Sequence, residues 1–224
     1  SRALKSVGKL DLWVLAGHKT DDDAKRKSVN EFGAIRDVAL ERARTTWSDR
    51  LVSLLNPRRM NLYYSTVKAS ERARLLATLE KYDMVWLHHL YVSYLYRLWH
   101  WPRSVMDIDD IPSTYERTVW QDSTRLPEKL MAGWKMWQWK RRERLLEERF
   151  SVLSVCSEQD RDYLRAFKRV HVIPNGFERP TAEPVRNPCK PPRIGFIGLM
   201  DYQPNLEGIR WFIRECWPLI KKES

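Results

Sequence analysis

Three acidic side chains follow one another closely after a short apolar segment in the middle of the chain. Residues 104–110 read SVMDIDD, which puts carboxylates at Asp107, Asp109 and Asp110. Carboxylates in such a group can stabilise positive charge that develops in a transition state, and they can also hold a divalent cation. The alternative is structural, with Asp107 in contact with polar neighbours and Asp110 capping the turn that follows.

A pair of histidines ends another apolar segment. Residues 83–87 read DMVWL, which predicts a buried strand, and His88 and His89 come directly after it. Neighbouring residues of a strand point to opposite faces, so at most one of the two imidazoles is expected to face a ligand. We predict that His88 or His89 contacts a bound ligand; a strand-end histidine hydrogen-bonded to the backbone is the alternative.

A glycine-containing loop lies near the end of the sequence. Residues 193–197 (RIGFI) predict a strand, and GLMDYQPN follows at residues 198–205. Glycine lets the backbone approach a phosphate, and the N-terminus of the helix predicted over residues 205–222 supplies N–H donors and a partial positive charge. The order favours a phosphate-binding loop at Gly198, with an ordinary strand-to-helix turn as the alternative.

Short apolar segments alternate with helical patterns along most of the chain. The predicted strands are residues 12–16, 34–40, 83–87, 104–108, 151–155, 170–173 and 193–197. The predicted helices are residues 41–55, 69–81, 90–99, 127–149, 158–167 (with Ser157 as N-cap) and 205–222, and residues 112–125 form a loop with helical character. This alternation predicts an α/β fold with a parallel, doubly wound sheet whose strands position the side chains described above.

Proline content marks a boundary between two domains. Six of the 12 prolines fall within residues 174–192, a composition typical of a linker. We therefore predict a Rossmann-like domain over residues 1–176, a Pro-rich linker over residues 177–192, and the start of a second Rossmann-like domain over residues 193–224. The sequence is expected to be a fragment at both ends, with a further strand and loop ahead of Ser1.

The charge of the chain favours an anionic partner. Lys and Arg number 40 against 29 Asp and Glu, which gives a formal net charge of +11. The basic residues are scattered and no nucleic-acid-binding motif is visible, so no nucleic-acid partner is predicted. Three widely spaced cysteines, and no apolar segment of about 20 residues, favour a cytoplasmic protein without a zinc ribbon or a membrane span.

Residues 150–212 resemble the crossover between the two halves of a GT-B glycosyltransferase of the retaining family 4 (glycosyltransferase group 1). The resemblance rests on VHVIPNGFE at residues 170–178 and on GLMDYQPN at residues 198–205, which is similar to the G-S-M-D-Y-x-P-N form of one branch of that family. It implies two Rossmann-like domains, the first holding the acceptor and the second a nucleotide-diphosphate sugar. It also implies transfer with retention of configuration, without a metal and without a cofactor other than the donor substrate.

The resemblance also assigns site residues. The donor-binding positions it implies are Gly198, Leu199, Met200 and Asn205. Asp109, with its neighbour Asp110, occupies the place where many members carry a catalytic histidine, and His88 and His89 fall on the acceptor side. A carboxylate there can stabilise an oxocarbenium-like transition state. The chain departs from the common pattern at Leu199 and Asn205, where many members carry an Arg or Lys that neutralises the leaving diphosphate.

A long helix that is both basic and rich in Trp is predicted before the crossover. Its segment at residues 134–149 reads WKMWQWKRRERLLEER. The apolar stripe predicted to pack on the sheet consists of Leu130, Trp134, Trp137 and Leu145. The candidates for contact with an anionic membrane lie off that stripe and are Lys135, Trp139, Lys140 and Arg142. Trp prefers the lipid interface and Lys and Arg favour anionic headgroups, which suggests a peripheral location at the inner face of the plasma membrane.

The function predicted from these observations is transfer of a sugar from a nucleotide-diphosphate donor to a polysaccharide or a glycolipid, with Asp109 and Asp110 as catalytic residues. Two alternatives stay open, namely a catalytically inactive GT-B scaffold and a basic nucleic-acid-binding protein. Residues 1–224 alone are expected to be inactive, because most of the implied donor pocket, including a carboxylate pair typical of the family, would lie beyond Ser224.

Overall fold

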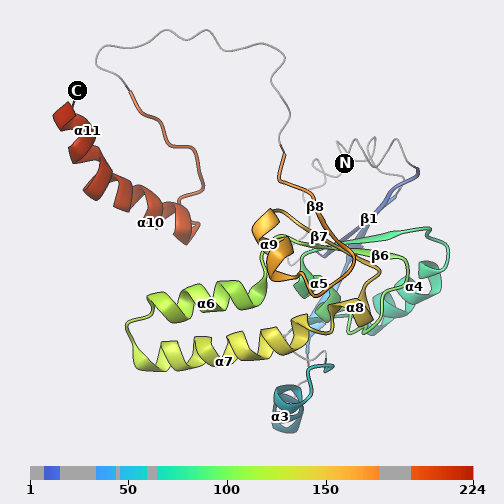
Figure 1. Cartoon of the computed structure of the whole chain (residues 1–224). Coiled ribbons are helices and arrows are strands. Elements are labelled where there is room, and N and C mark those ends of the chain that lie inside the picture. Colours follow the sequence, from blue (N-terminus) through green and yellow to red (C-terminus); the bar gives the residue numbers. More distant parts are fainter. Residues whose placement is uncertain (1–7, 16–33, 44–45, 60–64, 177–192, 224) are drawn as a thin grey trace. The chain divides into compact units, whose positions relative to one another are not determined.

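The computed structural model describes residues 8–15, 34–43, 46–59, 65–176 and 193–223 (Figure 1). The chain divides into two compact units, Ser1–Gly176 and Phe177–Ser224. The linker predicted over residues 177–192 and the last residue of the strand predicted over residues 12–16 lie outside the described residues.

A parallel four-stranded sheet forms the centre of the first unit. Its strands, in spatial order, are β5 (Val85–His88), β6 (Ser104–Ile108), β7 (Val152–Val155) and β8 (Val170–Val172). Met106, Ile108 and Leu153 are buried on one face of this sheet, and Ser154 is buried on the other. The sheet confirms the predicted α/β class with a parallel sheet, and residues 104–108 form the strand expected there.

Helices connect the parallel strands. They are α5 (Leu90–Leu95), α6 (Pro112–Asp122), α7 (Leu126–Glu143), α8 (Leu146–Arg149) and α9 (Glu158–Tyr163). The helix predicted over residues 127–149 is therefore interrupted between α7 and α8, and the loop predicted at residues 112–125 contains α6. The predicted N-cap of α9 is confirmed, because the Ser157 hydroxyl accepts a hydrogen bond of 3.1 Å from the Asp160 backbone N–H.

Among the described residues, two small sheets and two helices precede the main sheet in sequence. Their elements are β1 (Asp11–Leu15) parallel to β2 (Ala34–Val38), β3 (Leu40–Arg42) antiparallel to β4 (Ser65–Val67), α3 (Trp47–Leu55) and α4 (Ala69–Leu79). The prediction of a helix over residues 41–55 is wrong at its start, because residues 41 and 42 pair with β4. Thr46 fixes the start of α3, since it exchanges hydrogen bonds with Asp49 in a capping box.

The core of the first unit contains a buried cation. The guanidinium of Arg149, a residue with 0% exposure, donates a hydrogen bond of 2.7 Å from Nη2 to the Ser93 hydroxyl. Its Cζ lies 4.4 Å from the ring centroid of Tyr94. Burial lowers the pKa of Arg149. The aromatic faces and hydrogen-bond acceptors around the guanidinium offset part of the cost of removing this charge from water.

Helices α6 and α7 pack against each other as a hairpin (Figure 1). The packed face of α7 contains Ala132, which is 2% exposed, and Gly133, where an added Cβ would meet a tryptophan ring of α6 at 3.2 Å. The prediction that Leu130, Trp134 and Trp137 pack on the sheet is wrong, because they are 65%, 42% and 49% exposed. Small residues determine which face of α7 meets α6, and the side chains of Leu130, Trp134 and Trp137 lie on the outside.

The described part of the second unit is helical. It contains α10 (Gln203–Trp211), a π-helical turn η1 (Phe212–Cys216) and α11 (Trp217–Glu223). The prediction of a strand at residues 193–197 is wrong: these described residues are not assigned as a strand, and Ile194 and Phe196 are exposed. An extended segment needs a neighbouring strand to satisfy its backbone, and the described residues offer it none. Within those same residues, no helix is long and apolar enough to cross a membrane.

Candidate functional site

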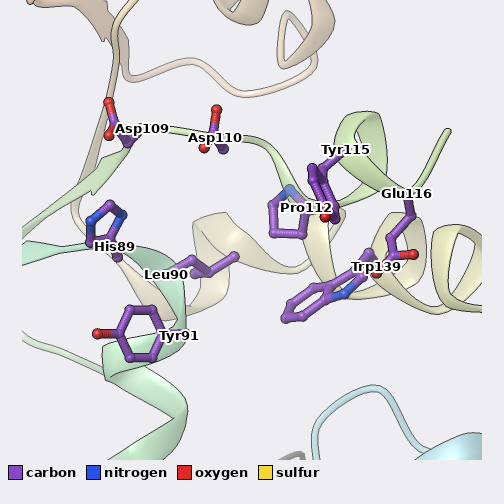
Figure 2. A pocket seen from close by; sticks show the side chains of 9 residues that line it. All are labelled: His89, Leu90, Tyr91, Asp109, Asp110, Pro112, Tyr115, Glu116 and Trp139. Atoms are coloured by element: carbon purple, nitrogen blue, oxygen red, sulfur yellow. The ribbon is translucent and has the colours of Figure 1, made fainter. Parts of the chain in front are cut away.

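A pocket of about 250 Å³ opens where β5 and β6 end (Figure 2). Its polar lining comes from His89, Asp109, Asp110 and Glu116, and its aromatic lining from Tyr91, Tyr115 and Trp139. His89 follows β5 directly and Asp109 follows β6 directly. Open α/β sheets bind ligands beyond the carboxyl ends of their strands, which makes this pocket the candidate site of the first unit.

The two residues predicted as catalytic both line this pocket. Asp109 is half-buried and Asp110 is exposed. In Figure 2 their carboxylates lie on one side of the view and the rings of Tyr91 and Trp139 on the other. The thiol of Cys156 donates to the Asp109 carbonyl oxygen at 3.4 Å, which ties this turn to the end of β7. The arrangement leaves both carboxylates available to accept hydrogen bonds from a ligand in the pocket.

The third acid of the cluster, Asp107, does not line the pocket. One of its carboxylate oxygens accepts a hydrogen bond of 2.8 Å from the Ser154 hydroxyl, and the other lies 2.9 Å from His88 Nδ1. These contacts join the ends of three adjacent strands, β5, β6 and β7. Asp107 is therefore a positioning residue, in agreement with the structural alternative considered for it.

The two histidines lie together rather than on opposite sides of a strand. His89 has φ of 65°, in the left-handed region, and the ring centroids of His88 and His89 are 3.9 Å apart. Strand alternation ends at His88, and the left-handed turn redirects the next side chain. Of the two, His89 lines the pocket and His88 pairs with Asp107. A non-glycine residue in this conformation costs folding free energy of about 1–3 kcal/mol, and such residues cluster at functional sites.

A buried hydrogen-bond network supports the wall of the pocket at the start of α6. Both carboxylate oxygens of Glu143 accept hydrogen bonds from Ser113, one from the backbone N–H at 2.9 Å and one from the hydroxyl at 2.6 Å. The Tyr163 hydroxyl lies 2.7 Å from Ser113 Oγ. Burial raises the pKa of Glu143, and the hydrogen bonds from Ser113 oppose that shift. This network was not predicted from the sequence, because Glu143 lies among basic residues in a segment typical of a solvent-exposed helix face.

The residues predicted to contact a membrane occupy different environments. The ring of Trp139 lines the pocket and meets the ring of Tyr94 edge-on, with centroids 5.7 Å apart. Arg142 is 3% exposed and donates to the Ser53 carbonyl at 3.0 Å. Arg142 is thus not presented to a surface, and its prediction as a membrane contact is wrong, whereas Trp139 is half-buried and faces the pocket. Lys140 is half-buried, and Lys135 is exposed and lies 3.7 Å from a carboxylate oxygen of Glu116.

The predicted donor loop lies at the start of α10 in the second unit. The side-chain amide of Asn205 donates to the Leu199 carbonyl at 3.0 Å, which closes the loop over residues 199–205. A Cβ added at Gly198 would lie 2.9 Å from Asn205 Nδ2, so a larger residue there would force the Asn205 side chain to shift. Leu199 and Met200 are exposed. The Asn205 side chain therefore shapes the loop, and backbone groups remain as the polar atoms that a phosphate could meet.

Within the described ranges, no group of three or more His, Cys, Asp or Glu side chains is placed to hold a metal ion. Comparisons of the chain with protein-family models, with curated proteins and with solved structures find no match. The first unit is thus defined by its own architecture, as an α/β protein with a parallel sheet and an acidic, aromatic-lined pocket at the carboxyl ends of its strands.

Proposed function

We propose that the protein takes part in the transfer of a sugar from a nucleotide-diphosphate donor, and that the pocket of the first unit holds a carbohydrate acceptor. One observation carries this proposal: the pocket combines three carboxylates, those of Asp109, Asp110 and Glu116, with three aromatic side chains. Carboxylates accept hydrogen bonds from sugar hydroxyls, and aromatic rings pack against the apolar C–H face of a pyranose. A volume of about 250 Å³ suits a single sugar ring at the end of an acceptor.

Asp109 and Asp110 have distinct roles in this proposal. Asp109, which is half-buried, would stabilise the positive charge that develops at the anomeric carbon during transfer. Asp110, which is exposed, would bind acceptor hydroxyls at the entrance of the pocket. His89 would hydrogen-bond the acceptor from the carboxyl end of the neighbouring strand β5. Its left-handed backbone sets the direction in which the side chain leaves the chain.

The second unit would bind the donor diphosphate at the N-terminus of α10. Pro204 has no N–H, and the N–H groups of Asn205 and Leu206 donate to the Tyr202 carbonyl, so the N–H of Gln203 and the helix dipole would favour an anion there. Neither Leu199 nor Asn205 supplies a positive charge, and the Asn205 amide already donates to Leu199. Backbone donors would therefore make the first contact with the diphosphate in this proposal.

The acceptor that we propose is a growing polysaccharide or a glycolipid at the cytoplasmic face of the plasma membrane. Support for a membrane-borne acceptor comes from the outer face of α7, where Leu130, Trp134 and Trp137 are exposed in a helix that also carries Lys and Arg. Apolar side chains and Trp with nearby basic residues favour an anionic lipid interface. These three residues replace Trp139 and Arg142 as the candidates for membrane contact.

Binding of sugars and nucleotide sugars to the isotope-labelled protein, residues 1–224, tests the proposal. Neutral monosaccharides and oligosaccharides are titrated while the backbone amides are observed by NMR, and UDP and GDP sugars are titrated separately. We expect saccharides to shift the amides of His89, Asp109 and Asp110, and one donor to shift those of residues 198–205. Asp109→Asn should weaken saccharide binding about tenfold or more, since hydrogen bonds to charged groups contribute about 1.5–3 kcal/mol.

The matched control is Asp122→Asn, at the exposed end of α6, which should leave saccharide binding unchanged. Saccharides that shift no amide around the pocket would contradict the acceptor site. Nucleotide sugars without effect on residues 198–205 would contradict a diphosphate contact at this loop.

A further inference from the structure

A second cavity, of about 740 Å³, lies between β1 and β5 in the first unit. It is lined by consecutive residues of both segments, residues 9–15 and residues 84–89. Successive side chains of a strand point to opposite faces, so a cavity on one face of a sheet would be lined by every second residue. Lining by consecutive residues instead places the cavity along the edges of the two strands.

Both edges carry backbone groups that point away from their own sheets. In the described residues, β1 pairs only with β2, and β5 is the outer strand next to β6. The N–H groups of Val85 and His89 donate to carbonyls of the β6 side, those of Arg103 and Asp107, at 2.9 and 3.0 Å. Donors alternate in direction along a parallel strand. The N–H and C=O groups of Trp86 and His88 therefore point to the other edge, toward the cavity.

The two strands run in the same direction on either side of the cavity. The Tyr82 hydroxyl, three residues ahead of β5, donates to a carboxylate oxygen of Asp11 at 2.9 Å, and Asp11 begins β1. The amino ends of β1 and β5 are thus neighbours. A strand inserted between them, parallel to both, would join the β1–β2 sheet and the four-stranded sheet into one continuous parallel sheet.

We propose that this cavity is a strand slot, a site that binds an extended apolar peptide of about five residues, the length of β1. Apolar side chains line it on the helix side as well, among them Leu75, Leu79 and Val92. In the adjacent strand β5, Leu87 is buried and Trp86 and His88 are exposed, so the peptide needs apolar side chains on the face that it shares with Leu87. A small apolar molecule would leave the edge N–H and C=O groups unpaired, which is costly, whereas a peptide strand pairs them.

The strand slot adjoins the candidate site. His89 and Tyr91 line both the slot and the pocket described above. The carboxyl end of a parallel peptide in the slot would lie at the level of His88, so the residues that follow it would reach the pocket. The inference does not depend on sugar transfer, since it rests on the strand edges alone.

Fusion of a strand to the N-terminus of the 224-residue chain tests the proposal. A Val-Ile-Val-Ile-Val segment is joined to Ser1 through a Gly-Ser linker of about 20 residues, above the dozen that a parallel crossover needs. The control fusion carries Ser-Gly-Ser-Gly-Ser in place of the apolar segment. We expect amide hydrogen exchange at Trp86 and His88 to slow at least tenfold in the apolar fusion and to stay unchanged in the control.

Two variants at one position separate backbone pairing from side-chain packing. Trp86→Pro removes an N–H that points into the slot and leaves the donors to β6 intact, whereas Trp86→Val keeps this N–H. The slowing at His88 should be lost in the proline variant of the fusion and kept in the valine variant. Equal exchange at Trp86 and His88 in the apolar and polar fusions would overturn the proposal, and this comparison decides even if Trp86→Pro fails to fold.

Discussion

The hydroxyl of Ser113 donates a hydrogen bond of 2.6 Å to the buried carboxylate of Glu143, thirty residues later in the chain. The contact joins the first turn of α6 to the last turn of α7, and Pro112, the residue before Ser113, lines the candidate pocket. A carboxylate at the N-terminus of a helix also interacts favourably with the helix dipole. The wall of the pocket is thus held by a residue that does not face it.

Glu143 should make the stability of the protein depend on pH. Its pKa is raised in the folded state by burial, so the folded protein binds a proton there more tightly than the unfolded chain does. The free energy of unfolding should therefore fall as the pH rises from the ordinary glutamate pKa through the raised one. Glu143→Gln does not titrate and should remove this fall, although its amide oxygen can accept only one of the two hydrogen bonds from Ser113. Urea unfolding across that pH range measures it, with Glu80→Gln at an exposed position as control.

Ser154 should contribute to stability through Asp107. Ser154→Ala removes a hydrogen bond of 2.8 Å and leaves one carboxylate oxygen of Asp107 without this donor. Because the site of Ser154 is buried, we expect the free energy of unfolding to fall by about 1–2 kcal/mol. Denaturant unfolding checks this, with the exposed Thr124→Ala expected to change it by less than about 0.5 kcal/mol. A loss at Ser154 no larger than at Thr124 would count against the bridge between β6 and β7.

Arg149 should not tolerate lysine. Its planar guanidinium lies over the rings of Tyr94 and Phe150 at 4.4 and 4.8 Å and donates to Ser93. An ammonium keeps the buried charge but loses the planar stacking and the fixed donor geometry. Arg149→Lys should therefore lower the free energy of unfolding by about 2 kcal/mol or more. The exposed Arg165→Lys is the control, and equal thermal unfolding midpoints for the two variants would refute this account of the core.

The exposed tryptophans of α7 should bind lipid. The double variant Trp134→Gln, Trp137→Gln should reduce sedimentation with vesicles of phosphatidylglycerol and phosphatidylcholine about tenfold or more, because burial of one large apolar side chain contributes about 1.5–3 kcal/mol. Stability should change little, since both side chains are solvent-exposed. The control is Trp211→Gln, which changes a tryptophan of α10 that is 61% exposed. Unchanged sedimentation of the double variant would remove the outer face of α7 as a membrane contact.

The central sheet could be predicted from the sequence because its strands are short, mostly apolar segments that alternate with helical ones. Residues 104–108 form a strand with the predicted bounds, and Ser157 caps α9 as its position before an acidic turn suggested. The prediction that the apolar stripe of α7 packs on the sheet was wrong, because periodicity identifies the apolar face of a helix but not the element that this face contacts. Small residues such as Ala132 decided the contact with α6 instead.

The candidate site was predictable only where its residues follow strands directly. Asp109 and Asp110 come immediately after β6 and were found by that position. Tyr115 and Trp139 come from two different helices and reach the pocket through the packing of the hairpin, which no local pattern encodes. The left-handed backbone at His89 was also not visible, since histidine gives no signal comparable to glycine for such a turn.

The backbone of His89 exposes this position to two opposing selective pressures. Glycine adopts φ of 65° without the penalty that a histidine side chain incurs, so variants selected for stability alone would favour glycine there. Variants selected for ligand binding would retain the imidazole, because it supplies one of the polar groups of the pocket. Laboratory evolution of this chain under the two regimes should therefore diverge at residue 89 before it diverges elsewhere around the sheet.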